Sequence, residues 1–146
     1  MKSVLLKTID STIFDITKGN VNFENIRFES DAVSYTLNVN SNGVYPFEYY
    51  GFTHSNDSSC GVYSSSSSPC KFFNCKFIKL YKCVSVMNNS EFHSCRFFNC
   101  IIACECRSFD PFFWNCYFTA CKHGIIMSNT SYNTMFVYNC WFDQIG

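Results

Sequence analysis

The sequence contains few of the residues that build α-helices. It has three alanines, four leucines and one glutamine in 146 residues, and these residue types are among the strongest helix formers. Seventeen phenylalanines and nine tyrosines are present instead, and aromatic residues favour the pleated, half-buried surface of a β-sheet. The composition therefore predicts an all-β protein and argues against a helical bundle.

An excess of one charge and long apolar runs are also missing. Eleven basic residues balance eleven acidic ones, so no basic stripe indicates a nucleic-acid partner. No stretch approaches the roughly 20 apolar residues that cross a bilayer. The run Val4-Leu5-Leu6 is too short for a signal-peptide core. We therefore expect no nucleic-acid partner and no membrane span, and the localisation stays open because a longer parent protein can be extracellular or lie on a cell or virion surface.

Cysteine, by contrast, is abundant, with 11 residues. In a short secreted chain this number would suggest a disulfide scaffold. The count is odd, however, and most of the cysteines recur at one position of a repeat. A flat ladder of equivalent cysteines does not readily meet the torsion that a disulfide needs. We therefore expect free thiols.

A degenerate repeat occupies most of the chain. Its copies read apolar-x-Asn/Ser-Cys-x-Phe, and their fourth positions are 20 to 25 residues apart. Two weaker copies lie at residues 23–28 and 47–52. The four clear copies are Phe72-Phe73-Asn74-Cys75-Lys76-Phe77, Phe92-His93-Ser94-Cys95-Arg96-Phe97, Phe113-Trp114-Asn115-Cys116-Tyr117-Phe118 and Val137-Tyr138-Asn139-Cys140-Trp141-Phe142.

A unit of this length cannot bury its own apolar face, so copies must stack on one another. Positions 4 and 6 are apolar and position 5 is often polar, which is typical of a strand with one buried face. A second short strand follows several copies, as in Gly124-Ile125-Ile126. A leucine-rich repeat would need a leucine framework, and a β-sandwich would show varied strands. The sequence predicts a single-stranded parallel β-helix of about six rungs, each of 20–25 residues.

Equivalent side chains in such a coil are expected to stack as ladders. Cysteine and phenylalanine are expected inside, and asparagine just before a corner, where it tolerates unusual backbone angles. The predicted ladder residues are Cys75, Cys95, Cys116 and Cys140; Phe77, Phe97, Phe118 and Phe142; and Asn74, Asn115 and Asn139.

The Asn-Cys-x-Phe copies, followed by Gly-Ile segments as in residues 116–125, resemble the pectate-lyase-like superfamily. That group includes polysaccharide lyases and hydrolases, phage tailspikes and repetitive surface proteins. The resemblance covers residues 20–146 and implies a right-handed parallel β-helix. Enzymes of the group usually have longer coils with capped ends. This chain departs from that pattern on both counts, which argues against an autonomous enzyme.

The remaining segments carry weaker signals. Residues 1–19 are expected to form a cap or an irregular first rung, and the serine-rich residues 53–70 a protruding loop. The last residues, 140–146, stop in or just after a strand, as expected for a fragment of a longer coil. An uncapped rung exposes unpaired backbone groups, which would favour end-to-end contact or a homo-oligomer.

Glu105, Arg107 and Asp110 form the densest charged group and are the candidate catalytic residues. Glycoside hydrolysis usually needs two carboxyl groups about 5–9.5 Å apart, and no second rung supplies a matching pair, so a solvated turn explains the group more simply. Cys100-x3-Cys104-x-Cys106 lacks the paired Cys-x2-Cys spacing of zinc sites. We therefore predict no metal and no cofactor.

Tyr117 and Trp141 occupy the phase of the repeat that should point outward, in one column. Exposed aromatic side chains can contact a sugar ring or another protein. The function expected is a non-catalytic structural or adhesive module of a surface, fibre or tailspike-like protein, with a polysaccharide or protein partner. The alternatives are a carbohydrate-active lyase or hydrolase, or a remnant of one, and a thiol-rich metal-binding protein.

Overall fold

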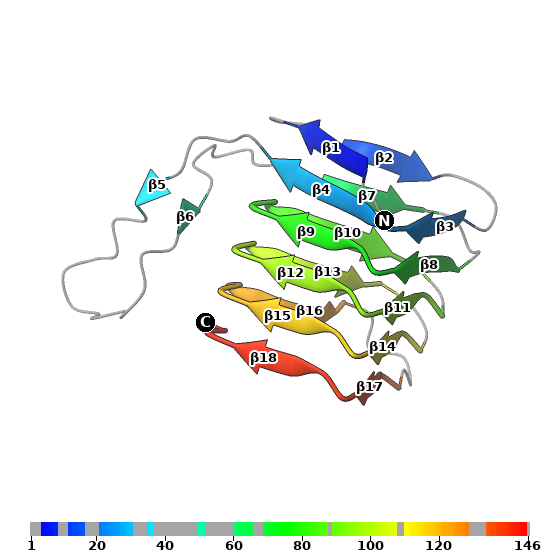
Figure 1. The fold of residues 1–146 in the computed structure, drawn as a ribbon. Helices are drawn as coiled ribbons and strands as arrows, with labels where there is room; N and C mark the ends of the chain where they lie inside the picture. The colour runs from blue at the N-terminus through cyan, green and yellow to red at the C-terminus, as the bar shows by residue number, and fades with distance from the viewer. Residues whose placement is uncertain are drawn as a thin grey trace.

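The computed structural model describes residues 4–8, 12–16, 21–30, 35–36, 50–51, 60–65, 69–87, 89–107, 110–128 and 134–145. They form a parallel β-solenoid with no helix among them, which confirms the predicted fold class. Three sheets run along the rod, and each turn of the chain contributes one strand to each sheet (Figure 1).

The strands of the three sheets pair in parallel throughout. Sheet A contains β1 (Val4–Thr8), β4 (Ile26–Ser30), β9 (Lys76–Ile78), β12 (Arg96–Phe98), β15 (Tyr117–Thr119) and β18 (Trp141–Asp143). Sheet B contains β2 (Thr12–Ile16), β7 (Cys60–Ser64), β10 (Lys82–Val86), β13 (Ile102–Cys106) and β16 (His123–Met127). Sheet C contains β3 (Val21–Glu24), β8 (Cys70–Phe73), β11 (Glu91–His93), β14 (Phe112–Trp114) and β17 (Phe136–Tyr138).

Four coils have all three strands, and the order within each is sheet C, sheet A, sheet B. They are β3-β4-β7, β8-β9-β10, β11-β12-β13 and β14-β15-β16. The strands β1 and β2 precede them, and β17 and β18 follow. The repeat motif therefore spans a sheet C strand, a corner and a sheet A strand.

The structure has four complete coils where the sequence predicted about six rungs, and residues 50–51, from the copy at 47–52, belong to none of the three sheets. β4 pairs directly with β9, and Phe28 lies opposite Phe77. Tyr50–Gly51 form β6, which pairs antiparallel with β5 (Tyr35–Thr36) outside the three sheets. Position 3 of this copy is Tyr49, where the other five copies have asparagine or serine, so it lacks the residue that is typical of the corner.

Two of the segments predicted outside the regular rungs contain strands. Residues 1–19 contribute β1 and β2, which pair in register with β4 and β7 as ordinary members of sheets A and B. The loop predicted at residues 53–70 is corrected at Cys60–Ser64, which form β7. Residues 53–59 and 66–68 lie outside the described residues.

Residues in the left-handed backbone region turn the chain at both corners of sheet A. At the first corner φ is 52° at Asn74, 54° at Ser94 and 53° at Asn115. Asparagine adopts this conformation at less cost than most residues, as the sequence predicted. At the second corner Lys79 and Ala120 also have positive φ, although lysine and alanine are not typical of left-handed turn positions.

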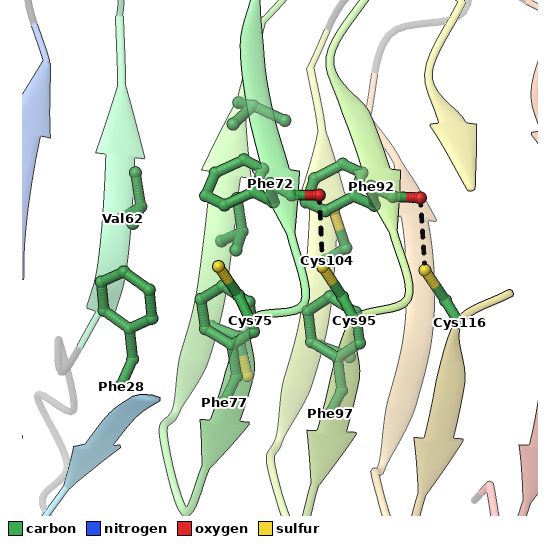
Figure 2. Close-up of a cluster of buried hydrophobic side chains, with 14 of the residues drawn as sticks. Phe28, Val62, Phe72, Cys75, Phe77, Phe92, Cys95, Phe97, Cys104 and Cys116 are labelled. Carbon is green, nitrogen blue, oxygen red and sulfur yellow. Dashed lines mark hydrogen bonds between the residues drawn. The ribbon is translucent and has the colours of Figure 1, made fainter. Parts of the chain in front are cut away.

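Two columns of phenylalanine rings fill the interior (Figure 2). Along a column the rings stack face to face, as between Phe77 and Phe97, with centroids 4.9 Å apart and planes 5° apart. Across the columns they meet edge to face, as between Phe72 and Phe77 at 6.0 Å. Full burial of such a ring is worth about 1.5–3 kcal/mol, so the columns dominate the core. Their buried members are Phe23, Phe72, Phe92 and Phe113 from sheet C, and Phe28, Phe77, Phe97 and Phe118 from sheet A.

Candidate functional site

The cysteines of the repeat lie just after the first corner and face the interior. Cys75, Cys95 and Cys116 are buried, while Cys140, on the last described rung, is half-buried. Each buried thiol lies about equally close to two carbonyl oxygens, one of a phenylalanine in the preceding coil and one two residues earlier in its own coil. Cys95 Sγ lies 3.5 Å from the carbonyl oxygen of Phe72, and Cys116 Sγ lies 3.4 Å from that of Phe92. Figure 2 marks these two contacts with dashed lines. The ladder is thus a set of weak hydrogen bonds between coils.

A second, shorter cysteine ladder follows the other corner. Cys100 Sγ lies 3.1 Å from the carbonyl oxygen of Phe98 and 3.7 Å from that of Phe77, one coil earlier. Cys121 Sγ likewise lies 3.4 Å from the carbonyl oxygen of Thr119 and 3.8 Å from that of Phe97. The pair Asn99-Cys100 repeats the Asn-Cys signal of the first corner, so the sequence did carry part of this information.

The structure holds all eleven cysteines as free thiols. Burial raises the pKa of Cys83 to about 11 and the pKa of Cys60 to about 12. Burial also raises the pKa of Cys95, Cys100 and Cys104 well above the ordinary value. Because the thiolate is the nucleophile and the metal ligand, these five groups are unreactive at neutral pH. Within the described ranges, no three His, Cys, Asp or Glu side chains converge as a metal ion would require.

The corner asparagines form a broken ladder on the outside. The side-chain nitrogen of Asn74 donates to Asn25 Oδ1 at 2.8 Å, and that of Asn139 donates to Asn115 Oδ1 at 2.7 Å. The two pairs are separated by Ser94, which takes the same left-handed position. These amides tie neighbouring coils together.

Glu105, the first candidate catalytic residue, is bound to its neighbours on sheet B. Lys82 Nζ and Ser85 Oγ both lie 2.7 Å from Glu105 Oε2. Burial acts to raise the pKa of Glu105, but these two hydrogen bonds outweigh it and hold the pKa below its usual value. The Glu105 carboxylate on β13 therefore links two neighbouring coils through its hydrogen bonds to β10.

The other two candidates also have structural partners. Arg107 donates to Tyr63 Oη at 3.0 Å and to the carbonyl of Ser64, and its guanidinium lies 4.5 Å from the centre of the Tyr63 ring. Asp110 Oδ1 accepts a hydrogen bond from the backbone nitrogen of Thr134 at 2.8 Å. Each of the three candidate side chains is therefore engaged in a separate contact of its own.

The candidate binding residues Tyr117 and Trp141 are adjacent on the outer face of sheet A. They lie opposite each other in the register of β15 and β18, and their exposed fractions are 48% and 64%. Arg96 and Lys76 continue the same column on β12 and β9. We call Lys76, Arg96, Tyr117 and Trp141 the sheet A strip.

The sheet A strip combines cations with aromatic rings. Neither Lys76 nor Arg96 forms an ion pair with a described residue, whereas Arg27, the next cation along the column, binds Glu29 at 2.7 Å. The Arg96 guanidinium lies 5.5 Å from the centre of the Tyr117 ring. A depression of about 460 Å³ runs beside the strip, lined by Lys76, Ile78, Arg96, Phe97, Phe98, Tyr117 and Thr119.

Sequence reasoning missed a second aromatic group, on the outer face of sheet C. Trp114 and Tyr138, at position 2 of the repeat, are 49% and 46% exposed. In a single strand, position 2 would share the buried face of positions 4 and 6. The left-handed residue at position 3 turns the chain instead, so that Phe113 points inward and Trp114 outward.

Comparison with known proteins gave no match to a family model, to a curated protein or to a solved structure. The described residues contain no helix long and apolar enough to cross a membrane.

Proposed function

We propose that this protein is a non-catalytic, adhesive β-solenoid module of a surface, fibre or tailspike-like protein, and that it binds a glycan along the sheet A strip. The observation that carries the proposal is the column of exposed aromatic side chains continued by two cations that have no described carboxylate partner. Surface aromatics gathered in this way mark interaction sites.

The ring faces in the strip support a sugar ligand. Tyr117 and Trp141 lie on neighbouring strands but do not stack on each other, and the contact to the Tyr117 ring comes from Arg96. Trp141 is the most exposed large apolar side chain among the described residues. An indole face open to solvent can contact the C–H groups of a pyranose ring, and a large aromatic carries much of the energy of such an interface.

The cations indicate the charge of the ligand. Lys76 and Arg96 lie opposite each other on neighbouring strands, so both can reach one anionic group. Hydrogen bonds between such cations and a carboxylate or sulfate are about twice as strong as neutral ones. The strip runs along the rod, where strands are about 4.8 Å apart. An extended acidic oligosaccharide lying parallel to the rod axis fits these features.

Titration calorimetry with a panel of acidic and neutral oligosaccharides tests the proposal. We expect Trp141→Ala and Tyr117→Ala each to weaken binding of the acidic ligand about tenfold or more, because each removes a stacking surface worth over about 1.4 kcal/mol. Trp114→Ala, an equally exposed aromatic on sheet C, is the matched control and should bind like the wild type. Unchanged affinity in both sheet A variants, or no binding to any glycan, would contradict the proposal.

A further inference from the structure

A second column of side chains runs parallel to the sheet A strip on the outer face of sheet A. Along the rod, this column consists of Glu29, Ile78, Phe98, Thr119 and Asp143. The depression of about 460 Å³ lies between the two columns, on β9, β12 and β15. Its floor is the backbone at Phe97, because the side chain of that residue is 1% exposed and belongs to the core.

The two walls of the depression differ in chemistry. Lys76 and Arg96 form one wall, and neither cation has a carboxylate partner among the described residues. Ile78 and Phe98 form the opposite wall, where Phe98 is 48% exposed. The two acidic residues of the second column do not line the depression. A ligand in the depression therefore meets positive charge on one side and an apolar surface on the other.

The distance between the walls suits a single sugar ring. Lys76 and Ile78 are two residues apart on β9, and Arg96 and Phe98 are two residues apart on β12. Because a strand rises about 3.3 Å per residue, the walls stand about 7 Å apart. A pyranose ring with one substituent on each side spans this width, so one sugar unit can contact both walls at once.

The geometry of a pyranose ring determines which substituents reach the two walls. In a hexuronic acid the carboxylate is attached to C5, and the ring atom directly opposite C5 is C2. The linkage atoms of a 1,4-linked chain, C1 and C4, form another opposite pair. Such a chain can therefore run along the rod while the substituents of C2 and C5 point to the walls. With the carboxylate bound to Lys76 and Arg96, the C2 substituent lies against Ile78 and Phe98.

An acetamido group at C2 fits the apolar wall better than a hydroxyl does. Its methyl group can pack on the exposed Phe98 ring, and burial of a methyl group is favourable. Thr119 follows Phe98 along the same wall, and its hydroxyl can donate to the amide carbonyl. We infer that the depression selects a uronic acid that carries an acetamido group at C2, within a 1,4-linked polysaccharide. This inference rests on the proposed function and names the sugar that the site prefers.

Titration calorimetry of the full chain with four trisaccharides tests the two walls separately. Chitotriose carries acetamido groups, and cellotriose has the same linkage without them. Oxidation of the primary hydroxyl groups converts each into the corresponding carboxylate. We expect oxidised chitotriose to bind about fivefold more tightly than oxidised cellotriose, because its methyl group is buried against the Phe98 ring. Oxidised chitotriose should also bind more tightly than chitotriose itself, because only the oxidised form pairs with the cations.

Two substitutions should remove the two preferences one at a time. Phe98→Ala should equalise the affinities for the two oxidised trisaccharides and keep the preference for carboxylates. Lys76→Gln should reduce the preference for carboxylates and keep the preference for the acetamido group. Trp114→Ala removes an equally exposed aromatic on sheet C, so it is the matched control and should keep both preferences. Ile78→Ser replaces Phe98→Ala if circular dichroism shows that the latter is not folded.

The outcomes separate failure of this inference from failure of the proposed function. If neither oxidised trisaccharide binds, as expected when a protein covers the depression, both are overturned. If the wild type binds the two oxidised trisaccharides equally and prefers them to the neutral forms, the acetamido site is overturned and glycan binding stands. A preference for the acetamido group that survives in Phe98→Ala would also overturn the site, because the group would then lie elsewhere.

Discussion

At the scale of single residues, the interior cysteines act as small apolar groups whose thiols can also donate weak hydrogen bonds. Their thiols lie 3.4–3.8 Å from carbonyl oxygens of the preceding coil, a distance suited to sulfur, and most are fully buried. A thiol fits this place better than a hydroxyl, because leaving a hydroxyl without a close acceptor costs about 1–3 kcal/mol. This accounts for the recurrence of cysteine at a buried position of the repeat.

The buried thiols make the free energy of unfolding depend on pH in the alkaline range. The pKa of Cys83 rises from 9.0 to about 11 because the thiol is buried, so between these values the folded state keeps a proton that the unfolded chain releases. The folded state binds more protons there, and stability falls as pH rises from about 9 to about 11, at up to about 1.4 kcal/mol per pH unit for each such thiol.

Urea unfolding between pH 7.5 and 10.5, under reducing conditions, measures this slope. Cys83→Ala should make it shallower, and the fold tolerates alanine there because Ala103 lies at the equivalent position of the next coil. Cys140→Ala, at a half-buried thiol, serves as the control and should change the slope less. Stability that is flat across this range would show that Cys83 is not buried as described.

At the scale of elements, the corners decide where strands begin and end. The first corner could be predicted, because asparagine and cysteine mark it in three of the four clear copies. The second could not be predicted in full, since Lys79 and Ala120 hold positive φ without being typical turn residues. Packing of the phenylalanine columns imposes that conformation against local preference.

The same corners explain the errors in the candidate site. Tyr117 lies after the corner and was correctly assigned to an outward position, whereas Trp114 lies before it and was missed because the turn inverts the alternation. The residues at 47–52 were counted as a rung from their aromatic pattern alone, although no asparagine or cysteine was present to form the turn. Glycan binding cannot be deduced from either pattern and stays a prediction.

Ser94 interrupts the asparagine ladder between Asn74 and Asn115, and Ser94→Asn should complete it. An amide at this left-handed position can donate to Asn74 and accept from Asn115, as the existing pairs do. We expect a gain of about 1 kcal/mol, because the new bonds are exposed, and a rise in Tm of about 2–4 °C. Ser94→Ala keeps the backbone but lacks the amide, so it should not raise Tm; equal stability of the two variants would contradict the role of the ladder.

At the scale of the whole molecule, the rod is a sum of contacts between neighbouring coils, as in other solenoids. The interior stack is continuous across the long connection between β4 and β7, because Phe28 lies 4.8 Å from Phe77, with planes 4° apart. The connection therefore leaves the order of coils intact, and the sheet A strip lies on the coils that follow it.

Removal of this connection tests the architecture most directly. In the next coil only three residues, 79–81, join β9 to β10, so residues 30–59 can be replaced by the tripeptide Asn-Cys-Ile copied from residues 99–101. If β4 stacks directly on β9, the shortened chain should keep a β-sheet circular dichroism spectrum and one cooperative thermal transition, with a Tm no lower than that of the full chain. Loss of the cooperative transition would contradict the account, because it would mean that the removed segment supplies a coil of the solenoid.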